Sequence, residues 1–254
     1  MIEIPRIIPV LLLQNSELVK TVQFKNPKYV GDPLNAVKIF NEKEVDELIF
    51  LDIAASNEKK NPPLSLLADI ASECFIPLCY GGGVRSIQMI KEILKVGIEK
   101  VSVNTFAAEN PNFIREAADN FGSSTIVVSI DVKKNLFGKY EVFSKGGRVN
   151  TKQDPVKYAV EMNKQGAGEL LLNSIDQDGT MKGYQIDFIS SISKEVDIPV
   201  VACGGAGSIE DFKTAIIEGG ASAVAAGSMF VFYGKHRGVL INYPSKNEIA
   251  EMFS

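Results

Sequence analysis

The hydrophobic residues of the chain form short unbroken runs, separated by longer amphipathic stretches. Runs that are apolar at successive positions are typical of parallel strands covered on both faces. The predicted strands are residues 6–13, 47–53, 76–80, 100–103, 125–131, 169–173, 198–202 and 223–226. The predicted helices are residues 33–43, 63–74, 86–96, 111–121, 155–165, 187–196 and 209–218, with Ser86 and Ser208 as N-caps.

Alternating strands and helices predict an α/β fold, either a closed (β/α)8 TIM barrel or an open doubly wound sheet. An internal repeat favours the barrel, because a duplicated four-strand half closes naturally on itself. The repeat, displaced by 122 positions, pairs Gly82, Gly83, Ser86 and Gly97 with Gly204, Gly205, Ser208 and Gly219. We therefore expect one domain over residues 1–254, a barrel of two duplicated half-barrels. A hairpin insertion is expected at residues 135–150, and a helix with a strand-like cover at 230–254.

The composition excludes several classes of function. The 254 residues include 27 basic and 31 acidic side chains, and the net charge of −4 favours neither nucleic acid nor a membrane surface as partner. Three cysteines without metal-ligand spacing, and a single histidine, indicate a reducing, cytoplasmic location and no metal site. No cofactor is expected. His236, within the basic run of residues 235–237, is interpreted as a surface or partner-docking residue.

Two glycine clusters follow the third and seventh predicted strands, and each has a partner segment after the next strand. Backbone N–H groups near helix N-termini, with Ser or Thr hydroxyls, bind phosphate. The candidate phosphate-binding residues are Gly82, Gly83, Asn104 and Thr105, and in the second half Gly204, Gly205, Gly227 and Ser228. Two sites on one rim imply an elongated ligand with phosphate at both ends. The alternative is that the glycines serve only the turns.

Three aspartates lie at or just after predicted strand ends, where barrel side chains face the active-site mouth. Asp131 ends the fifth strand, and a carboxylate there can act as a general acid or base. Asp52 is equally well explained by a hydrogen bond that braces a loop. Asp178 is better explained as a turn residue before Gly179.

The chain resembles the cyclase subunit of imidazole glycerol phosphate synthase. The resemblance runs from Arg6 to about Phe232 and rests on residues 6–9, 31–33, 46–48, 51–53, 81–83, 100–105, 121–123, 166–169 and 204–207. It implies a glutaminase subunit docked at the N-terminal face of the barrel, and ammonia passing through the barrel to its mouth. There ammonia is condensed with a bisphosphate-like substrate, giving imidazole glycerol phosphate and an aminoimidazole ribotide. Aspartates on strands one and five serve as acid and base.

The first strand departs from this pattern. Where the family has Cys-Leu-Asp-Val, the chain reads Val-Leu-Leu-Leu, so Leu12 stands at the position of a catalytic aspartate while Asp131 is kept. General acid–base catalysis typically contributes about 10²–10⁴-fold in rate, so this loss should cripple cyclisation. Lys20 matches the family's mobile-loop lysine, within a changed loop at residues 14–21.

The resemblance also implies a salt-bridged ring of charges at the bottom of the barrel. The matching residues are Arg6, Glu47, Lys100 and Glu169. Burying four charges at the N-terminal ends of strands makes sense only if they pair with one another. We interpret the ring as a gate for ammonia. The alternative is an ion network that merely plugs the barrel.

A narrower group of cyclase-like proteins, found in bacterial surface-polysaccharide clusters, looks similar to this chain at residues 11–13, 19–25 and 234–237. That resemblance implies a relay of ammonia from a glutaminase to an ATP-dependent amidotransferase that makes acetamidino sugars. Two other hypotheses stay open. One is the histidine-pathway cyclase itself, with Asp131 acting alone or helped by Asp178. The other is a phosphosugar isomerase. Such enzymes also rely on an aspartate in the first strand, so Leu12 argues against this hypothesis as much as against the cyclase.

Overall fold

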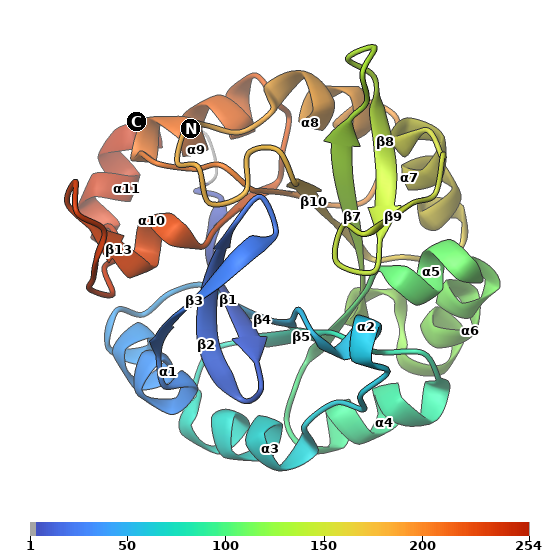
Figure 1. Ribbon diagram of the computed structural model, residues 1–254, viewed down its shortest axis with the longest axis horizontal. Helices are drawn as coiled ribbons and strands as arrows, with labels where there is room; N and C mark the ends of the chain where they lie inside the picture. Colours follow the sequence, from blue (N-terminus) through green and yellow to red (C-terminus); the bar gives the residue numbers. More distant parts are fainter. Residues whose placement is uncertain (1–3, 254) are drawn as a thin grey trace.

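The computed structural model describes residues 4–253, and eight parallel strands close into a barrel (Figure 1). The barrel strands are β1 (Arg6–Gln14), β4 (Leu48–Asp52), β5 (Leu78–Gly81), β6 (Lys100–Val103), β7 (Ile126–Lys134), β10 (Glu169–Ser174), β11 (Val200–Cys203) and β12 (Ala223–Ala226). Their order is β10-β11-β12-β1-β4-β5-β6-β7, and the pairing of β7 with β10 completes the ring. The (β/α)8 prediction is confirmed, and the open doubly wound sheet is excluded.

A layer of helices surrounds the barrel (Figure 1). The helices of this layer are α1 (Pro33–Glu42), α3 (Leu64–Glu73), α4 (Ile87–Lys95), α6 (Asn112–Phe121), α7 (Pro155–Lys164), α8 (Ile186–Ser193), α9 (Ile209–Ile217) and α11 (Lys246–Phe253). Ser86 and Ser208 each accept a backbone N–H at the start of their helix, so both predicted N-caps are confirmed. Each helix buries an apolar face against the barrel, as the fully buried Phe40 and Ile90 show.

The two halves of the barrel repeat one strand–turn–helix unit. Strand β5 and helix α4 correspond to β11 and α9, displaced by 122 positions. The turn after each strand needs glycine. A Cβ at Gly82 (φ 135°) would lie 2.7 Å from the Cβ of Asp52, and one at Gly205 (φ 121°) would lie 2.1 Å from the carbonyl oxygen of Gly183. These turns therefore leave their backbone on the rim of the barrel uncovered by any side chain of their own.

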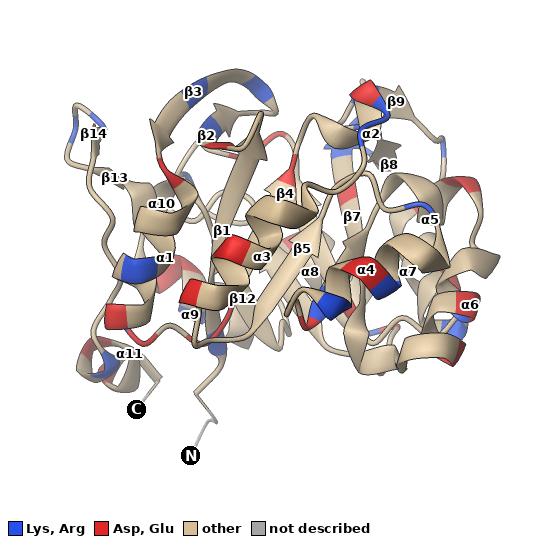
Figure 2. Cartoon of the chain, turned by 90° about the horizontal axis from the view of Figure 1, so that it is seen from below, with Lys and Arg blue, Asp and Glu red and all other residues tan. Residues whose placement is uncertain are grey.

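Smaller elements decorate the barrel, and several gather at the mouth, opposite the end where the chain termini lie (Figure 2). They are the strands β2 (Glu17–Val22), β3 (Lys25–Gly31), β8 (Tyr140–Ser144), β9 (Val149–Asn150), β13 (Phe232–Tyr233) and β14 (Gly238–Val239), the helices α2 (Ala55–Glu58), α5 (Thr105–Glu109) and α10 (Ser228–Val231), and the 3-10 turn η1 (Ser123–Thr125). The insertion at 135–150 and the tail are confirmed; Ser254 lies outside the described residues.

The interpretation of residues 14–21 as a loop was wrong. Strand β2 pairs antiparallel with the end of β1, and β3 pairs with β2. The two strands form a hairpin, called the lid hairpin below, that stands over the mouth of the barrel (Figure 1). Hydrophobic periodicity does not reveal the hairpin, since β3 is polar and exposed along most of its length.

No helix within residues 4–253 is long and apolar enough to cross a lipid bilayer.

Candidate functional site at the barrel mouth

A cavity of about 310 Å³ opens at the carboxyl ends of the barrel strands. All thirteen residues that the sequence analysis placed at the mouth line it. They are Leu12, Lys20, Asp52, Gly82, Gly83, Asn104, Thr105, Asp131, Asp178, Gly204, Gly205, Gly227 and Ser228. Both glycine clusters therefore face one cavity, as the duplicated rim predicts, and their roles as phosphate sites remain predictions.

Asp131 is a buried carboxyl group at the end of β7. Its Oδ2 accepts a hydrogen bond of 3.3 Å from Nδ2 of Asn104. Burial raises the pKa of Asp131 to about 7, and the charge of Asp178 adds to the rise, while hydrogen bonds from Asn173 and Ser129 oppose it. A carboxyl group with this pKa exchanges a proton readily near neutral pH, which suits general acid or base chemistry.

The pKa of Asp131 predicts how stability changes with pH. Between about pH 4 and pH 7 the folded chain keeps a proton on Asp131 that the unfolded chain has released. The free energy of unfolding therefore falls as pH rises through this window, by about 1.4 kcal/mol per unit from this one group. Urea unfolding at several pH values should show the wild type losing stability relative to Asp131→Asn up to pH 7 and no further. A constant difference between the two proteins would contradict the assignment.

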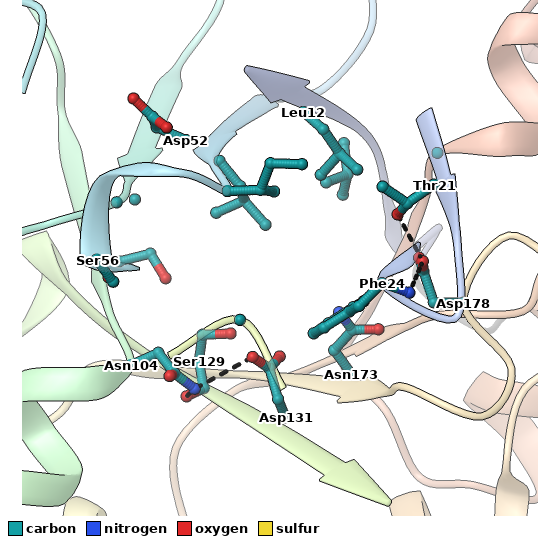
Figure 3. A pocket seen from close by; sticks show the side chains of 18 of the residues that line it. Leu12, Thr21, Phe24, Asp52, Ser56, Asn104, Ser129, Asp131, Asn173 and Asp178 are labelled. Carbon is teal, nitrogen blue, oxygen red and sulfur yellow. Dashed lines mark hydrogen bonds between the residues drawn. The ribbon is translucent and has the colours of Figure 1, made fainter. Parts of the chain in front are cut away.

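Leu12 faces the cavity from β1, on the side opposite Asp131 (Figure 3). Its neighbours in register are Val19 of β2 and Leu51 of β4. Leu12 lines the cavity together with Val10 and Leu51, and these three side chains make an apolar wall where the resemblance places a carboxylate. No group in this wall can donate or accept a proton.

Lys20 lies in β2, and its ammonium group is buried in the mouth of the barrel. It donates a hydrogen bond to the carbonyl oxygen of Val10. A Cβ at Gly227 would lie 2.6 Å from its Nζ, so the cation stands beside the partner segment of the second glycine cluster. Burial lowers the pKa of Lys20 to about 8, and the negative charge of Asp178 opposes this by raising it. Lys20 is thus placed to pair with an anion bound at that cluster.

Asp178 does more than end a turn, because it holds the lid hairpin over the cavity. Its Oδ2 accepts hydrogen bonds from Oγ1 of Thr21 at 3.0 Å and from the backbone N–H of Phe24 at 3.5 Å. Its backbone oxygen accepts from the N–H of Gln23 at 2.9 Å. Burial raises the pKa of Asp178, and the hydrogen bond from Thr21 and the charge of Lys20 oppose this rise. The carboxylate therefore links the turn after β10 to the lid (Figure 3).

Replacing Asp178 with Ala should loosen the lid hairpin. The hydrogen bond from Thr21 to the charged group is worth about 1.5–3 kcal/mol, so its loss alone should lower amide protection of residues 17–31 by about 10–100-fold. Hydrogen–deuterium exchange with mass spectrometry measures this, with the exposed Asp119→Ala as control. Equal protection of this segment in all three proteins would show that other contacts hold the lid.

The side chains of three candidate residues already form hydrogen bonds with other parts of the protein. Oδ1 of Asp52 accepts the N–H groups of Ala54 and Ala55, both at 3.0 Å, so the loop-bracing interpretation is confirmed. Nδ2 of Asn104 also donates to the carbonyl oxygen of Ser129 at 3.0 Å. Thr105 Oγ1 accepts from a backbone N–H of the β8–β9 loop at 3.0 Å. Asn104 is better placed to orient Asp131 than to bind phosphate.

The sequence analysis missed two residues that shape the acid–base region. Ser129 and Asn173 line the cavity beside Asp131 (Figure 3). Asn173 is opposite Asp131 in the register of β10 and β7. The signal in the sequence that could have found Asn173 is its position at the end of the predicted strand 169–173.

The opposite end of the barrel carries the predicted ring of charges. Arg6 contacts Glu47 at 2.5 Å and also pairs with Glu169. Lys100 Nζ lies 2.8 Å from Glu47 and 2.9 Å from Glu169. Burial lowers the pKa of Lys100, but the two carboxylates raise it more, and its net pKa lies above the ordinary value. The four charges thus form one closed network, in which both carboxylates are buried.

Between the ring and the cavity, the barrel interior is apolar. Its buried side chains are Ile8, Val10, Ile49, Cys79, Val127, Leu171, Val201, Cys203, Ala223 and Ala225. An ion would lose its hydration there at a high cost, whereas a small neutral molecule would not. Within the described residues, no group of three or more His, Cys, Asp or Glu side chains could hold a metal ion.

Comparison with known proteins decides the family. The family model described as "Histidine biosynthesis protein" matches residues 6–237. The chain belongs to this histidine biosynthesis family. Within it, the chain is similar to HisF subunits of imidazole glycerol phosphate synthase.

Relatives in this family match the chain over nearly its whole length. A protein of Pseudomonas aeruginosa, provisionally named as imidazole glycerol phosphate synthase subunit hisF2, is 51% identical over 96% of this chain and 97% of its own. A Leptospira borgpetersenii protein with a similarly provisional HisF name is 49% identical over 98% of both chains. The HisF subunit of Alkaliphilus metalliredigens is 44% identical over 89% of both.

Proposed function

We propose that this chain is the barrel subunit of a glutamine amidotransferase system, and that it relays ammonia rather than cyclising a substrate. A glutaminase docks at the charged ring, and ammonia crosses the apolar interior to the mouth. The observation that carries the proposal is the contrast between the two ends of the barrel. The ring of four charges is complete. The mouth has Leu12 where acid–base chemistry needs a carboxylate.

The acceptor at the mouth is an ATP-dependent amidotransferase that installs the nitrogen on an N-acetylated sugar, which makes an acetamidino sugar for surface polysaccharide. The support for this finer assignment is the sequence resemblance at residues 11–13, 19–25 and 234–237. A phosphorylated ligand fits the mouth, because Lys20 and the glycine-rich turns lie together at the second half of the rim.

The second candidate is the cyclase of imidazole glycerol phosphate synthase. The names of these three relatives favour it over the relay, since each refers to that synthase. Asp131 also supports it, because its pKa of about 7 suits a proton-transfer group. Asp178, whose charge acts on Asp131, would be its helper, although that carboxylate is occupied by the lid.

A cyclase assay separates the two candidates. The purified chain is given ammonium salt and the bisphosphate-like substrate, with no glutaminase present. The relay predicts binding of the substrate without turnover. Turnover near 1 s⁻¹, an ordinary enzyme rate, would overturn the relay and assign the chain to the histidine pathway.

A further inference from the structure

The lid hairpin and the tail meet at one aromatic ring near the mouth. Nζ of Lys28, in β3, lies 5.8 Å from the centre of the Phe232 ring, and the guanidinium carbon of Arg237 lies 5.6 Å from it. Arg237 also donates a hydrogen bond of 2.7 Å to the carbonyl oxygen of Gly179. Two segments about 200 positions apart in the sequence therefore share a small site outside the cavity.

The cations at this site have no carboxylate partner. Among residues 4–253, neither Lys28, Lys235 nor Arg237 lies within 4 Å of an Asp or Glu oxygen. Lys and Arg on β3 and on the β13–β14 hairpin both lie at the mouth end of the barrel (Figure 2). Like charges gathered without counter-charges repel one another, and a bound anionic group would relieve that repulsion.

An exposed aromatic side chain accompanies the cations. Tyr233 is 68% exposed, and it lies between the buried Phe232 and the exposed Lys235 and His236. Exposed aromatics beside Arg are the residue types that dominate protein–protein contacts. We call Lys28, Phe232, Tyr233, Lys235 and Arg237 the tail patch.

The tail patch is connected to the lid. Gly179, which accepts from Arg237, follows Asp178, and Asp178 accepts from Thr21 of the lid. Lys28 is itself part of the lid. A partner bound at the tail patch would therefore hold the lid hairpin and the tail together beside the mouth.

We propose that the tail patch docks an acidic segment of the protein that consumes ammonia at the mouth. This inference rests on the proposed relay. Ammonia released into neutral water is protonated and loses its nucleophilic lone pair, so the consuming enzyme must cover the mouth. A protein fits better than a nucleic acid, since the chain as a whole carries a charge of −4 and the patch is small.

The test measures association of the purified chain with the ATP-dependent sugar amidotransferase of the same organism. The Lys28→Glu/Arg237→Glu double variant should bind about tenfold or more weakly, and high salt should weaken the wild type in the same way. The double variant Lys91→Glu/Lys139→Glu makes the same charge change at exposed lysines elsewhere and should bind normally. A photocrosslinker in place of Tyr233 should label an acidic segment of the amidotransferase.

The outcome separates the docking proposal from the relay. Unchanged binding by the Lys28/Arg237 variant, or crosslinks only to the glutaminase, to nucleic acid or to a second copy of the chain, would overturn the docking proposal. The relay is tested by a separate experiment. It is supported if Glu47→Ala still uncouples glutamine hydrolysis from product, and it is refuted if the wild type cyclises. Arg237→Lys keeps the positive charge and should retain most of the binding. This variant therefore separates the loss of charge from misfolding caused by any substitution at this position.

Discussion

Replacing Leu12 with Asp should raise ammonium-dependent cyclisation by about 10²–10⁴-fold over the wild type, the usual contribution of one acid–base group. The reason is that only this part of the acid–base pair is missing from the mouth. Asp131 is in place with a pKa of about 7, and both glycine clusters line the same cavity. Leu12 lies across that cavity from Asp131 (Figure 3).

The measurement is steady-state product formation with ammonium salt, compared with two control variants. Leu12→Asn is close in size to Leu12→Asp and cannot exchange a proton, so it should stay inactive. Leu12→Asp/Asp131→Asn should lose the gain, because each carboxyl group needs the other. If Leu12→Asp binds substrate but gains nothing, the mouth has diverged beyond one residue, and the relay account is strengthened.

The pattern of the sequence predicted the barrel well because buried parallel strands leave a direct signature. All eight runs became barrel strands, and the repeat at Gly82 and Gly204 placed two equivalent turns on one rim. The ring of charges could also be predicted, but only through resemblance. No spacing rule brings Arg6, Glu47 and Glu169 together before the barrel is closed.

The lid hairpin and the environment of Asp131 could not be predicted in the same way. Strand β3 is polar and exposed along most of its length, and β2 buries Leu18 and Val19 only once the hairpin has paired with the end of β1. The hydrogen bond from Asn104 to Asp131 joins β6 to β7, and Thr21 meets Asp178 from 157 positions away. Such contacts depend on side-chain directions that only the closed barrel fixes.

Replacing Glu47 with Ala should uncouple the two ends of the barrel. Glu47 pairs with both cations of the ring, so its loss leaves Arg6 and Lys100 with Glu169 alone. Removing one partner from a buried ion network costs about 3 kcal/mol, near the low end of the usual range, because Arg6 remains 34% exposed. The ring would then admit water, and ammonia would be lost as ammonium before it reaches the mouth.

The coupling is read from the source of the nitrogen in the product. With amide-labelled glutamine and unlabelled ammonium present together, the wild type should build mostly labelled nitrogen into product, and Glu47→Ala several-fold less per glutamine hydrolysed. Glu73→Ala breaks an exposed pair with Lys38, and it should change neither the coupling nor the stability by more than about 1 kcal/mol. Glu47→Gln keeps the side chain's size and guards against misfolding. If both Glu47 variants transfer labelled nitrogen as the wild type does, the ring is a structural plug, and ammonia does not pass through it.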